Sequence, residues 1–399
     1  RGVSSMKAII LAGGKGTRLR PLTYTRPKGL VPVANKAFLD YQIELLRLYG
    51  FNEIVLSLNY RADDFKSHFG DGSHWGLSIA YVVEERPLGT GGAIKNCEPH
   101  LDGEPVLVLN GDVLTDINLA EIVEYHKGKG GEVTLTLTEV SDPTIYGLVL
   151  TDNEGRVTGF LEKPGWEEVV ANTINAGIYV LEPSFIRKIP AGREVSLERE
   201  VFPALLKGGL PAPQRWGPQG FLKREARASP GEGAPGVGEE SPSVMWGYIS
   251  CGYWLDIGSI RKYLQAHYDI LDRKLSAVLP GRNFGRGIYT GKGNRLYKGS
   301  RLVGPVALGN YVTVEAGAQV GPWAVIGDRS QIASGAVVCE SVVLDDVVIG
   351  REARLRHTIV DSGCEIKEGC IVESTVIAAK TVLGKGSLVD PELARTALL

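Results

Sequence analysis

Short apolar runs alternate with amphipathic segments over the first half of the chain. Ala8–Ala12 is continuously apolar and ends in glycines, a pattern typical of a strand buried on both faces. Leu39, Ile43 and Leu46 follow at helical spacing, and Gly50 closes that segment. This alternation predicts a doubly wound, mostly parallel α/β sheet, which binds ligands beyond the carboxyl ends of its strands.

The same alternation continues toward the middle of the chain. Further strands are predicted at 54–56, 79–83 and 106–109, and helices at 62–69 and from Gly91 onward. Residues 246–257 are predicted as a strand and a turn. Ser259 is predicted to cap a helix that ends near Leu271. Together these elements define a first domain at 6–275.

A segment inside this domain has a different composition. Residues 207–244 are rich in glycine and proline and hold few apolar side chains. Such a stretch buries too little surface to offset the entropy of ordering, so we expect a flexible insertion.

The pattern changes again toward the C-terminus, where aliphatic side chains recur at a spacing of six with occasional steps of five. The positions are Val314, Val320, Ile326, Ile332, Val338, Leu344, Ile349, Leu355, Val360, Ile366 and Val372. A hexad repeat indicates a parallel β-helix, in which each short face points one aliphatic side chain inward. We therefore predict a linker at 276–302 and a β-helix domain at 303–390.

Composition narrows the class of protein. Lys and Arg number 44 against 46 Asp and Glu, so nothing favours a nucleic-acid partner. No apolar run approaches the roughly 18 residues of a membrane helix, and Ala8–Ala12 is too short for a signal-peptide core. The five cysteines include no Cys-x-x-Cys pair, which argues against a disulfide scaffold or a structural zinc site. We expect a cytoplasmic protein with no membrane partner.

The loop after the first predicted strand could bind phosphate. Its glycine-rich turn at 13–16 exposes backbone N–H groups, and Arg18 adds a cation with a rigid donor fork. Lys28 lies between Pro27 and Pro32, which stiffen the segment that presents it. The loop matches neither the dinucleotide fingerprint nor the Walker A motif. An ordinary strand-to-helix turn and a solvated lysine are the alternatives.

Two carboxylates follow predicted strands and lie beside glycines. Asp112 ends Asn110-Gly111-Asp112, and Asp256 lies in a glycine-flanked segment much later in the chain. Together they could share a Mg²⁺ that also bridges substrate phosphates. The alternative is that each acid only caps a helix or forms a turn. The six histidines show no metal-ligand spacing.

The order of these motifs resembles that of the sugar-1-phosphate nucleotidyltransferases, and within them most closely the mannose-1-phosphate guanylyltransferases. The resemblance covers 6–206 and 246–275, and a left-handed β-helix tail is also found in that family. It depends on Gly-Gly-Lys-Gly-Thr-Arg-Leu (13–19), Pro-Lys (27–28), Leu-Gly-Thr-Gly-Gly (88–92), Asn-Gly-Asp (110–112), Glu-Lys-Pro (162–164), Asn-Ala-Gly (175–177) and Gly-Tyr-Trp-Leu-Asp-Ile-Gly (252–258). Two features depart from the family pattern: Gly29 replaces the usual second proline, and the Gly/Pro-rich insertion precedes Asp256.

The resemblance implies attack of a sugar 1-phosphate on the α-phosphate of a nucleoside triphosphate, with release of pyrophosphate. It implies Mg²⁺ on Asp112 and Asp256, with Arg18 and Lys28 as the other catalytic residues. Lys163 should hold the sugar phosphate, while Gly147, Glu162 and Asn175 contact sugar hydroxyls. The nucleotide should be bound by Leu11, Ala12, Gly13, Gly14, Gly16, Thr17, Glu84 and Gly89.

The nature of the base depends on Glu84. In the family a residue about five before the glycine of the Leu-Gly-Thr segment reads the base edge, and here that residue is Glu84. A carboxylate only accepts hydrogen bonds, and guanine offers two adjacent donors, whereas uracil and thymine offer one donor between acceptors. Glu84 therefore favours GTP, and the alternative is a solvated acid at a strand end.

Other functions remain open at this stage. A glucose-1-phosphate uridylyl- or thymidylyltransferase would use the same motifs, and mannose and glucose differ in one hydroxyl only. A regulatory subunit that senses nucleotide sugar without turnover is a second alternative. Acyl transfer by the β-helix is disfavoured, because His357 is its only histidine. We expect the β-helix to join copies of the chain into a homo-oligomer through its flat faces.

Overall fold

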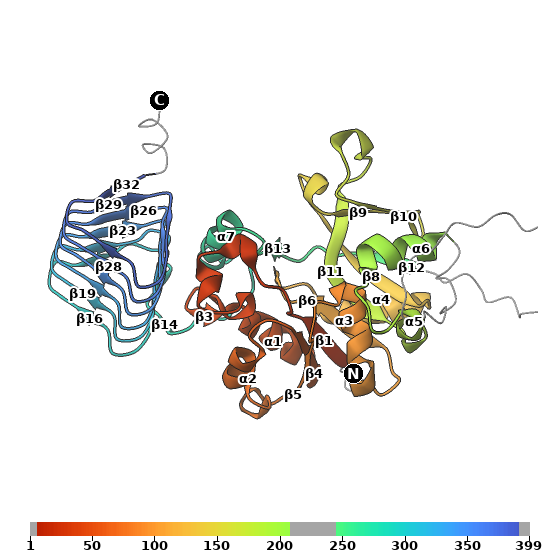
Figure 1. Ribbon diagram of the computed structural model, residues 1–399. Helices are drawn as coiled ribbons and strands as arrows, with labels where there is room; N and C mark the ends of the chain where they lie inside the picture. The colour runs from red at the N-terminus through yellow and green to blue at the C-terminus, as the bar shows by residue number, and fades with distance from the viewer. Residues whose placement is uncertain (1–5, 208–244, 391–399) are drawn as a thin grey trace, which may run out of the picture.

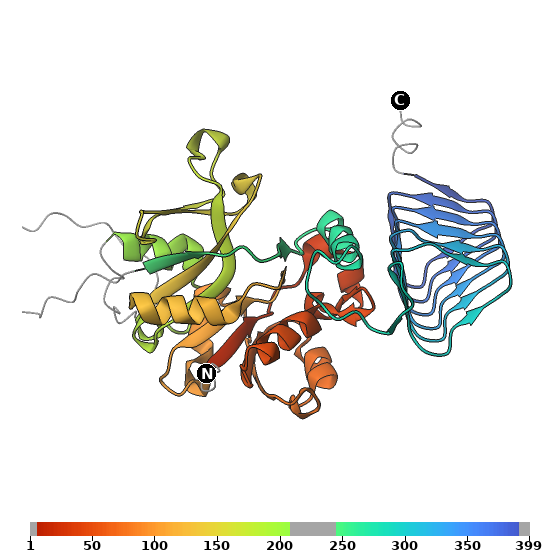
Figure 2. The same cartoon turned by 180° about the vertical axis from the view of Figure 1, so that it is seen from behind.

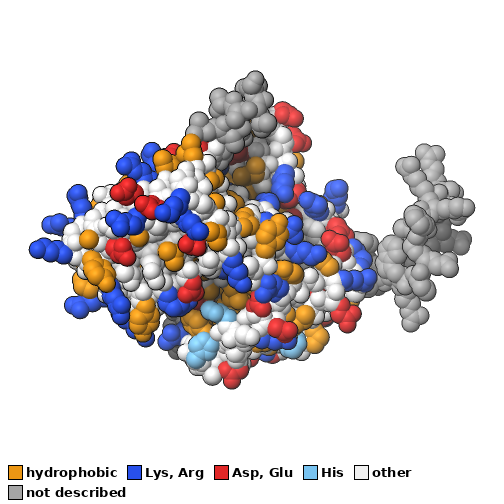
Figure 3. Space-filling view, turned by 60° about the vertical axis from the view of Figure 1, so that its left-hand side comes forward, with side chains coloured by type: hydrophobic (Ala, Val, Ile, Leu, Met, Phe, Trp, Pro, Cys, Tyr) orange, Lys and Arg blue, Asp and Glu red, His pale blue; other side chains and the backbone are white. Residues whose placement is uncertain are grey.

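The computed structural model describes residues 6–207 and 245–390, which form an α/β domain followed by a stack of short strands (Figures 1 and 2). Apart from Lys207, the predicted insertion at 207–244 lies outside the described residues. In the described part of the chain, no helix combines the length and apolar character that a bilayer span requires. Basic and acidic side chains are interspersed over the face shown in Figure 3, in keeping with a formal net charge of −2.

The first half of the main sheet is parallel, as predicted. Strand β1 (Lys7–Leu11) lies between β4 (Glu53–Leu58) and β6 (Val106–Asn110), and β5 (Ser78–Val83) extends the sheet beyond β4. Ile9 and Ile10 are both fully buried and belong to the cores on opposite faces of the sheet. A continuous apolar run therefore marks a strand covered on both sides.

The second half of the sheet is mixed. Strand β11 (Thr173–Leu181) runs antiparallel to β6, and its other neighbours are β8 (Val133–Glu139) and β9 (Gly147–Thr151), with β10 (Val157–Glu162) at the edge. Strand β12 (Met245–Ile249) pairs in parallel with β8. The chain therefore returns to this sheet after the insertion.

Helices cover both faces of the sheet, which confirms the doubly wound architecture (Figure 1). The helix predicted at 62–69 has those bounds, and Ser259 caps the last helix by accepting a hydrogen bond from the Lys262 amide at 3.4 Å. The helices are α1 (Phe38–Leu48), α2 (Ala62–Phe69), α3 (Gly89–Cys97), α4 (Leu119–Lys129), α5 (Pro183–Lys188), α6 (Phe202–Leu206) and α7 (Ile260–Leu271).

Two small strand pairs complete the α/β domain. Strand β7 (Val113–Thr115) pairs antiparallel with β13 (Trp254–Asp256), directly beyond the end of β6. Strands β2 (Pro32–Val33) and β3 (Lys36–Ala37) form a hairpin before α1. The 3-10 turns η1 (Thr17–Leu19), η2 (Leu22–Tyr24) and η3 (Lys28–Leu30) connect β1 to this hairpin.

The C-terminal domain is the predicted β-helix, with three parallel sheets that repeat around a common interior. One sheet begins with the antiparallel pair β14 (Arg282–Asn283) and β15 (Ile288–Thr290) and continues through β18 (Val306–Leu308), β21 (Ala324–Ile326), β24 (Val342–Val343), β27 (Ile359–Val360) and β30 (Val376–Ile377). The second contains β16 (Arg295–Leu296), β19 (Thr313–Val314), β22 (Gln331–Ile332), β25 (Val348–Ile349), β28 (Glu365–Ile366) and β31 (Val382–Leu383). The third contains β17 (Arg301–Leu302), β20 (Gln319–Val320), β23 (Val337–Cys339), β26 (Arg354–Arg356), β29 (Ile371–Glu373) and β32 (Leu388–Val389).

Two expectations about this domain need correction. Strands β14–β17 lie in the predicted linker 276–302, so the β-helix begins earlier than the aliphatic repeat indicates. The predicted repeat also assigned Leu344 to the interior of the β-helix, whereas the interior residue is Val343. Leu308 pairs with Ile326, but Ile326 pairs with Val343, so this coil is one residue shorter than the coil before it. Val343 therefore points into the interior, and Leu344 packs outside it in the core shared with the α/β domain.

The register correction can be tested by a pair of matched truncations. Val343 is fully buried, whereas Val348 is 38% exposed. We expect Val343→Ala to lower the stability of the β-helix by roughly 2 kcal/mol, because it leaves a cavity in a packed interior. Val348→Ala should change it by less than about 0.5 kcal/mol. Thermal unfolding followed by circular dichroism measures both variants, and equal effects would contradict the register.

Candidate active site

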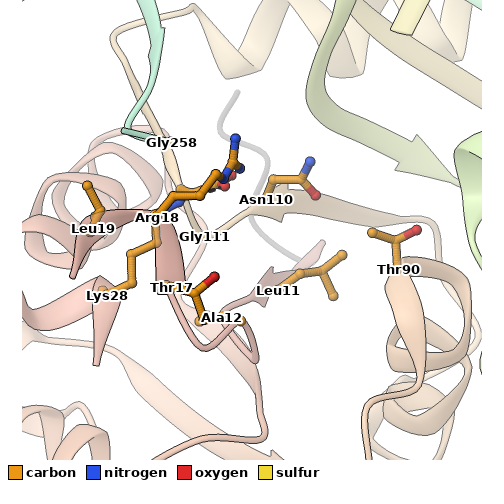
Figure 4. Close-up of a pocket in the computed structure, with 14 residues that line it drawn as sticks. Leu11, Ala12, Thr17, Arg18, Leu19, Lys28, Thr90, Asn110, Gly111 and Gly258 are labelled. Atoms are coloured by element: carbon orange, nitrogen blue, oxygen red, sulfur yellow. Dashed lines mark hydrogen bonds and ion pairs between the residues drawn. The ribbon is translucent and has the colours of Figure 1, made fainter. Parts of the chain in front are cut away.

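A glycine-rich loop follows β1 and forms one wall of a cavity of about 340 Å³. Gly16 has φ of +61°, and a Cβ there would lie 3.0 Å from the Lys28 Cβ and from the Thr23 side chain. Only glycine fits without displacing the turn. Arg18 and Lys28 lie on one side of the cavity and Thr90 of α3 on the other (Figure 4). The lining residues predicted from sequence are Leu11, Ala12, Gly14, Gly16, Thr17, Arg18, Lys28 and Asp112.

Lys28 contacts the segment that directly follows β6. Its Nζ donates a hydrogen bond to Asp112 Oδ2 at 2.8 Å. Burial by itself would raise the pKa of Asp112, but the Lys28 ammonium and the nearby Arg18 guanidinium outweigh it and hold that pKa below its usual value. Asp112 is therefore an anion, held by cations from the loop that follows β1.

Gly29 has a local structural reason to be glycine. It is buried in turn η3, and a Cβ there would lie only 2.9 Å from the Phe65 ring of α2. The close approach of Gly29 to Phe65 packs the turn that carries Lys28 against α2. At this position packing, and not a second proline, restricts the turn.

Asp256 is brought to Asp112 by the pairing of β13 with β7. The Ile257 amide donates to the Asp112 carbonyl at 2.8 Å, so the two acids belong to directly hydrogen-bonded segments. Asp256 Oδ1 accepts hydrogen bonds from the Tyr146 hydroxyl at 2.6 Å and from Lys262 Nζ of α7. Burial, together with this bond to Asp256, raises the pKa of Tyr146. Each acid thus has a lysine partner.

The donor set fits a divalent cation that is completed by substrate. No group of three His, Cys, Asp or Glu side chains gathers as a metal site among residues 6–207 and 245–390. Two carboxylates on neighbouring segments are a donor set that could hold a divalent cation together with waters and substrate phosphates. Asp112 and Asp256 supply such a pair.

A second cavity of about 240 Å³ adjoins the first and shares Leu11, Gly14 and Thr90 with it. It brings together the remaining nucleotide-binding residues predicted from sequence, Gly13, Glu84 and Gly89.

Glu84 in this second cavity is 7% exposed and follows β5. Its Oε1 accepts from the Ser57 hydroxyl at 3.1 Å and its Oε2 from the Leu88 amide at 3.0 Å. Burial raises the pKa of Glu84, and these two donors oppose the rise. The Glu84 carboxyl group is therefore buried and fixed by two hydrogen bonds, and it is not a solvated acid.

The four predicted sugar-binding residues line neither cavity, but Gly147, Glu162 and Lys163 lie close to Tyr146, which donates a hydrogen bond to Asp256. Gly147 follows Tyr146 and pairs with Glu162 across β9 and β10. The Lys163 amide donates to the Tyr146 carbonyl at 2.8 Å, while its 57% exposed side chain lies 3.8 Å from Glu162 Oε1. Asn175 is half-buried, and its Nδ2 donates to the Tyr179 hydroxyl at 2.8 Å.

Sequence reasoning missed Tyr146 and Lys262. Lys262 follows Ser259 by three positions, and an N-cap at Ser259 places it in the first turn of α7, near Asp256. That spacing was a usable signal. Tyr146 had none, because its neighbour Asp256 is 110 residues away in the chain.

A mostly parallel sheet with a cationic glycine-rich loop and two neighbouring carboxylates beyond its strand ends is typical of a phosphoryl-transfer enzyme. The nucleotidyl transferase family model matches residues 7–273, and the model of the GMPPB C-terminal domain matches residues 302–394. The chain belongs to the nucleotidyl transferase family, and its activity is that of a sugar-1-phosphate nucleotidyltransferase.

Several curated relatives align along most of the chain. A mannose-1-phosphate guanylyltransferase of Mycobacterium tuberculosis is 35% identical over 366 residues, covering 92% of this chain and 82% of that protein. Mannose-1-phosphate guanylyltransferase 1 of Arabidopsis thaliana is 32% identical and covers 94% of this chain and 92% of its own length. A UTP–glucose-1-phosphate uridylyltransferase of Synechocystis is also 32% identical, with 92% and 90% covered.

Solved structures share the fold. HddC from Yersinia pseudotuberculosis, complexed with GMP-PN, aligns at a TM-score of 0.50 and 26% identity, over 66% of this chain and 99% of that one. A putative glucose-1-phosphate thymidylyltransferase from Bacillus anthracis aligns at a TM-score of 0.54 and 21% identity, over 70% and 98% of the two chains. The second likeness concerns the fold alone.

The seating of η3 against α2 makes a testable prediction. We expect Gly29→Ala to lower stability by about 1–3 kcal/mol through overpacking against Phe65, and to lower turnover about tenfold by displacing Lys28. Adding Phe65→Leu should restore part of both. Gly128→Ala in α4 is the matched control, because its Cβ would meet open space. Wild-type turnover in Gly29→Ala would show that this contact does not position Lys28.

Proposed function

We propose that this enzyme transfers GMP from GTP to mannose 1-phosphate, giving GDP-mannose and pyrophosphate. The observation that carries the proposal is the buried carboxylate of Glu84 in the cavity beside the phosphate loop. The names of the relatives from Mycobacterium tuberculosis and Arabidopsis thaliana support it.

The chemistry needs no general base. The second pKa of a phosphate monoester is about 6, so the sugar 1-phosphate is already largely a dianion at neutral pH. The enzyme has to align two anions that repel each other and to stabilise the charge that develops at the α-phosphorus. Fixed cations and backbone donors supply both effects without rearranging during the step.

Arg18 and Lys28 would bind the triphosphate together with the amides of the 11–17 loop. Both cations line the cavity, and residues of this loop, which follows β1, line it as well. Arg18 offers a planar fork suited to two phosphate oxygens, whereas Lys28 acts as a point charge. Lys28 contacts Asp112 at 2.8 Å and would exchange part of that contact for phosphate oxygens.

Asp112 and Asp256 would hold the Mg²⁺ used by this reaction. When bound, the ion neutralises charge on the triphosphate and on the transferring phosphorus. Lys28 and Lys262 would balance the charge of the two carboxylates until the ion and substrate arrive. Tyr146, which donates to Asp256 at 2.6 Å, would orient that carboxylate.

The sugar phosphate would bind next to Tyr146. Lys163 is more than half exposed and free to move toward a phosphate, and its backbone is fixed to the Tyr146 carbonyl. Glu162, Asn175 and the backbone of Gly147 would contact hydroxyls of the sugar. The Trp254 ring packs edge-on against the Tyr146 ring, with 5.3 Å between the ring centroids. It would limit the depth of that site.

A glucose-1-phosphate uridylyltransferase is the second candidate, because the Synechocystis relative matches as much of the chain. A regulatory subunit without turnover is less well supported, because Arg18, Lys28, Asp112 and Asp256 are all present. Pyrophosphate release, measured for four triphosphates against mannose and glucose 1-phosphates, separates the three functions. Fastest release with UTP and glucose 1-phosphate, or no release with any pair, would overturn the proposal.

We also propose that the protein is cytoplasmic and that its β-helix joins copies of the chain. All five cysteines are free in the structure, and three of them are buried. The flat faces of a β-helix suit self-association. Light scattering of the full chain would report a single copy if the oligomer proposal is wrong.

The metal assignment predicts a large loss of turnover. We expect Asp112→Asn and Asp256→Asn each to lower kcat by orders of magnitude with little change in melting temperature, because each removes one anionic ligand. Asp63→Asn is the control, since that side chain is 95% exposed on α2. Near-normal rates at saturating Mg²⁺ in either site variant would remove that carboxylate from the site.

The base assignment predicts a change in nucleotide preference. Glu84→Gln places an amide donor against guanine donors and should cost roughly 1.5–3 kcal/mol in kcat/KM for GTP, while UTP improves. Glu85→Gln serves as the control, because Glu85 is the exposed neighbour. The ratio of kcat/KM for GTP and UTP measures the effect. A ratio that does not fall in Glu84→Gln would show that Glu84 does not read the base.

A further inference from the structure

The segment from the end of β1 to the start of α1, which carries Arg18 and Lys28, lies between the α/β core and the β-helix (Figures 1 and 2). One hydrophobic cluster joins the three parts. From the segment it takes Leu19, Leu22, Val31, Val33, Ala34 and Phe38. From the β-helix it takes Ala307, Val325, Val342, Leu344 and Ile359. The β-helix therefore packs directly behind the loop that lines the active-site cavity.

Two side chains, one on either side of Lys28, form hydrogen bonds from this segment to the β-helix. Arg26 Nη2 donates to Asp361 Oδ1 at 2.9 Å and to Ser362 Oγ at 3.1 Å. Asn35, at the tip of the β2–β3 hairpin, donates through Nδ2 to the Ile326 carbonyl at 3.0 Å. Lys28 thus lies in a short span of chain held to the second domain at both ends.

The side chain of Asp361 is fully buried, so its charge has to be balanced by Arg26 and not by water. Its Oδ1 also accepts from the Ser362 amide at 2.7 Å, whereas Oδ2 has no hydrogen-bond partner among the described residues. Burial raises the pKa of Asp361, and the Arg26 guanidinium opposes that rise. A buried carboxylate with one free oxygen depends on its cation, so the geometry of this pair is strongly constrained.

The chain between Arg26, which pairs with the buried Asp361, and Lys28 has little conformational freedom. Only Pro27 lies between Arg26 and Lys28, and its ring restricts φ, here −70°. Gly29 is in turn pressed against Phe65, and Lys28 extends to Asp112 at 2.8 Å. A shift of Arg26 therefore moves the backbone of Lys28 and cannot be absorbed by flexible chain between them.

We propose that Asp361 of the β-helix is a positioning residue for catalysis, acting through Arg26 to hold Lys28 against the triphosphate. The inference rests on the proposed role of Lys28 in binding the triphosphate. It makes the β-helix part of the active-site support and not only a surface for assembly.

The test uses the full chain with charges removed but shapes kept. Asp361→Asn and the double variant Arg26→Gln/Asp361→Asn are compared with Asp346→Asn, which breaks an exposed β-helix pair with Arg329. We expect kcat/KM for the nucleoside triphosphate to fall about tenfold to a hundredfold in the first two, because displacement of a catalytic group by about 1 Å has that effect. The KM for sugar 1-phosphate and the rate of Asp346→Asn should stay unchanged.

Combination with Lys28→Met separates positioning from structural support. If Asp361 acts through Lys28, then Asp361→Asn adds nothing further once Lys28 is Met, and the two effects are not additive. The double variant keeps the test valid if Asp361→Asn alone does not fold, because it leaves no unpaired buried charge. Wild-type kinetics in a folded variant, or full additivity with Lys28→Met, would overturn the inference. Wild-type kinetics in Lys28→Met itself would instead contradict the proposed role of Lys28.

Discussion

The pairing of β7 with β13 is the contact on which the site depends. It joins a strand that follows the buried β6 to one that lies beyond the insertion, and it brings Asp112 and Asp256 to one edge of the sheet. Neither acid forms a site alone. Together they create a concentration of negative charge that the fold has to compensate, and the surrounding cations do so.

That compensation explains much of the local structure. Lys28 comes from the turn after the glycine-rich loop and Lys262 from the first turn of α7, and each contacts one of the acids. A partly buried carboxylate is stable as an anion only with such partners. Lys28 and Arg18 also line the cavity beside the glycine-rich loop, so the charges that stabilise Asp112 suit this cavity to an anionic substrate.

The β-helix contributes to this arrangement from outside. From Ile326 onward each coil is one residue shorter than the coil that precedes Ile326, and this change turns Leu344 outward into the core shared with the α/β domain. The buried Asp361 then meets Arg26 across the same interface. A solenoid whose interior tolerates coils of slightly different length can place individual side chains on its outer faces where a neighbouring domain needs them.

Periodicity in the sequence was enough for the parallel strands, most helices and the β-helix, because burial on two faces, on one helical stripe or at every sixth residue leaves a direct trace in the order of apolar residues. The loop chemistry was visible for a similar reason, since Arg18 and Asp112 lie just beyond glycine-marked strand ends and Lys28 lies between two prolines.

The tertiary structure decided what local pattern cannot encode. It set the side-chain contacts of Glu84, the join of Asp256 to Tyr146, the one-residue register change at Val343 and the tie between Arg26 and Asp361. Each of these relations joins residues from separate elements, and in the tie from Arg26 to Asp361 they are hundreds of positions apart. Spacing along the chain carries no information about such contacts, because they arise only when the packed elements bring them together.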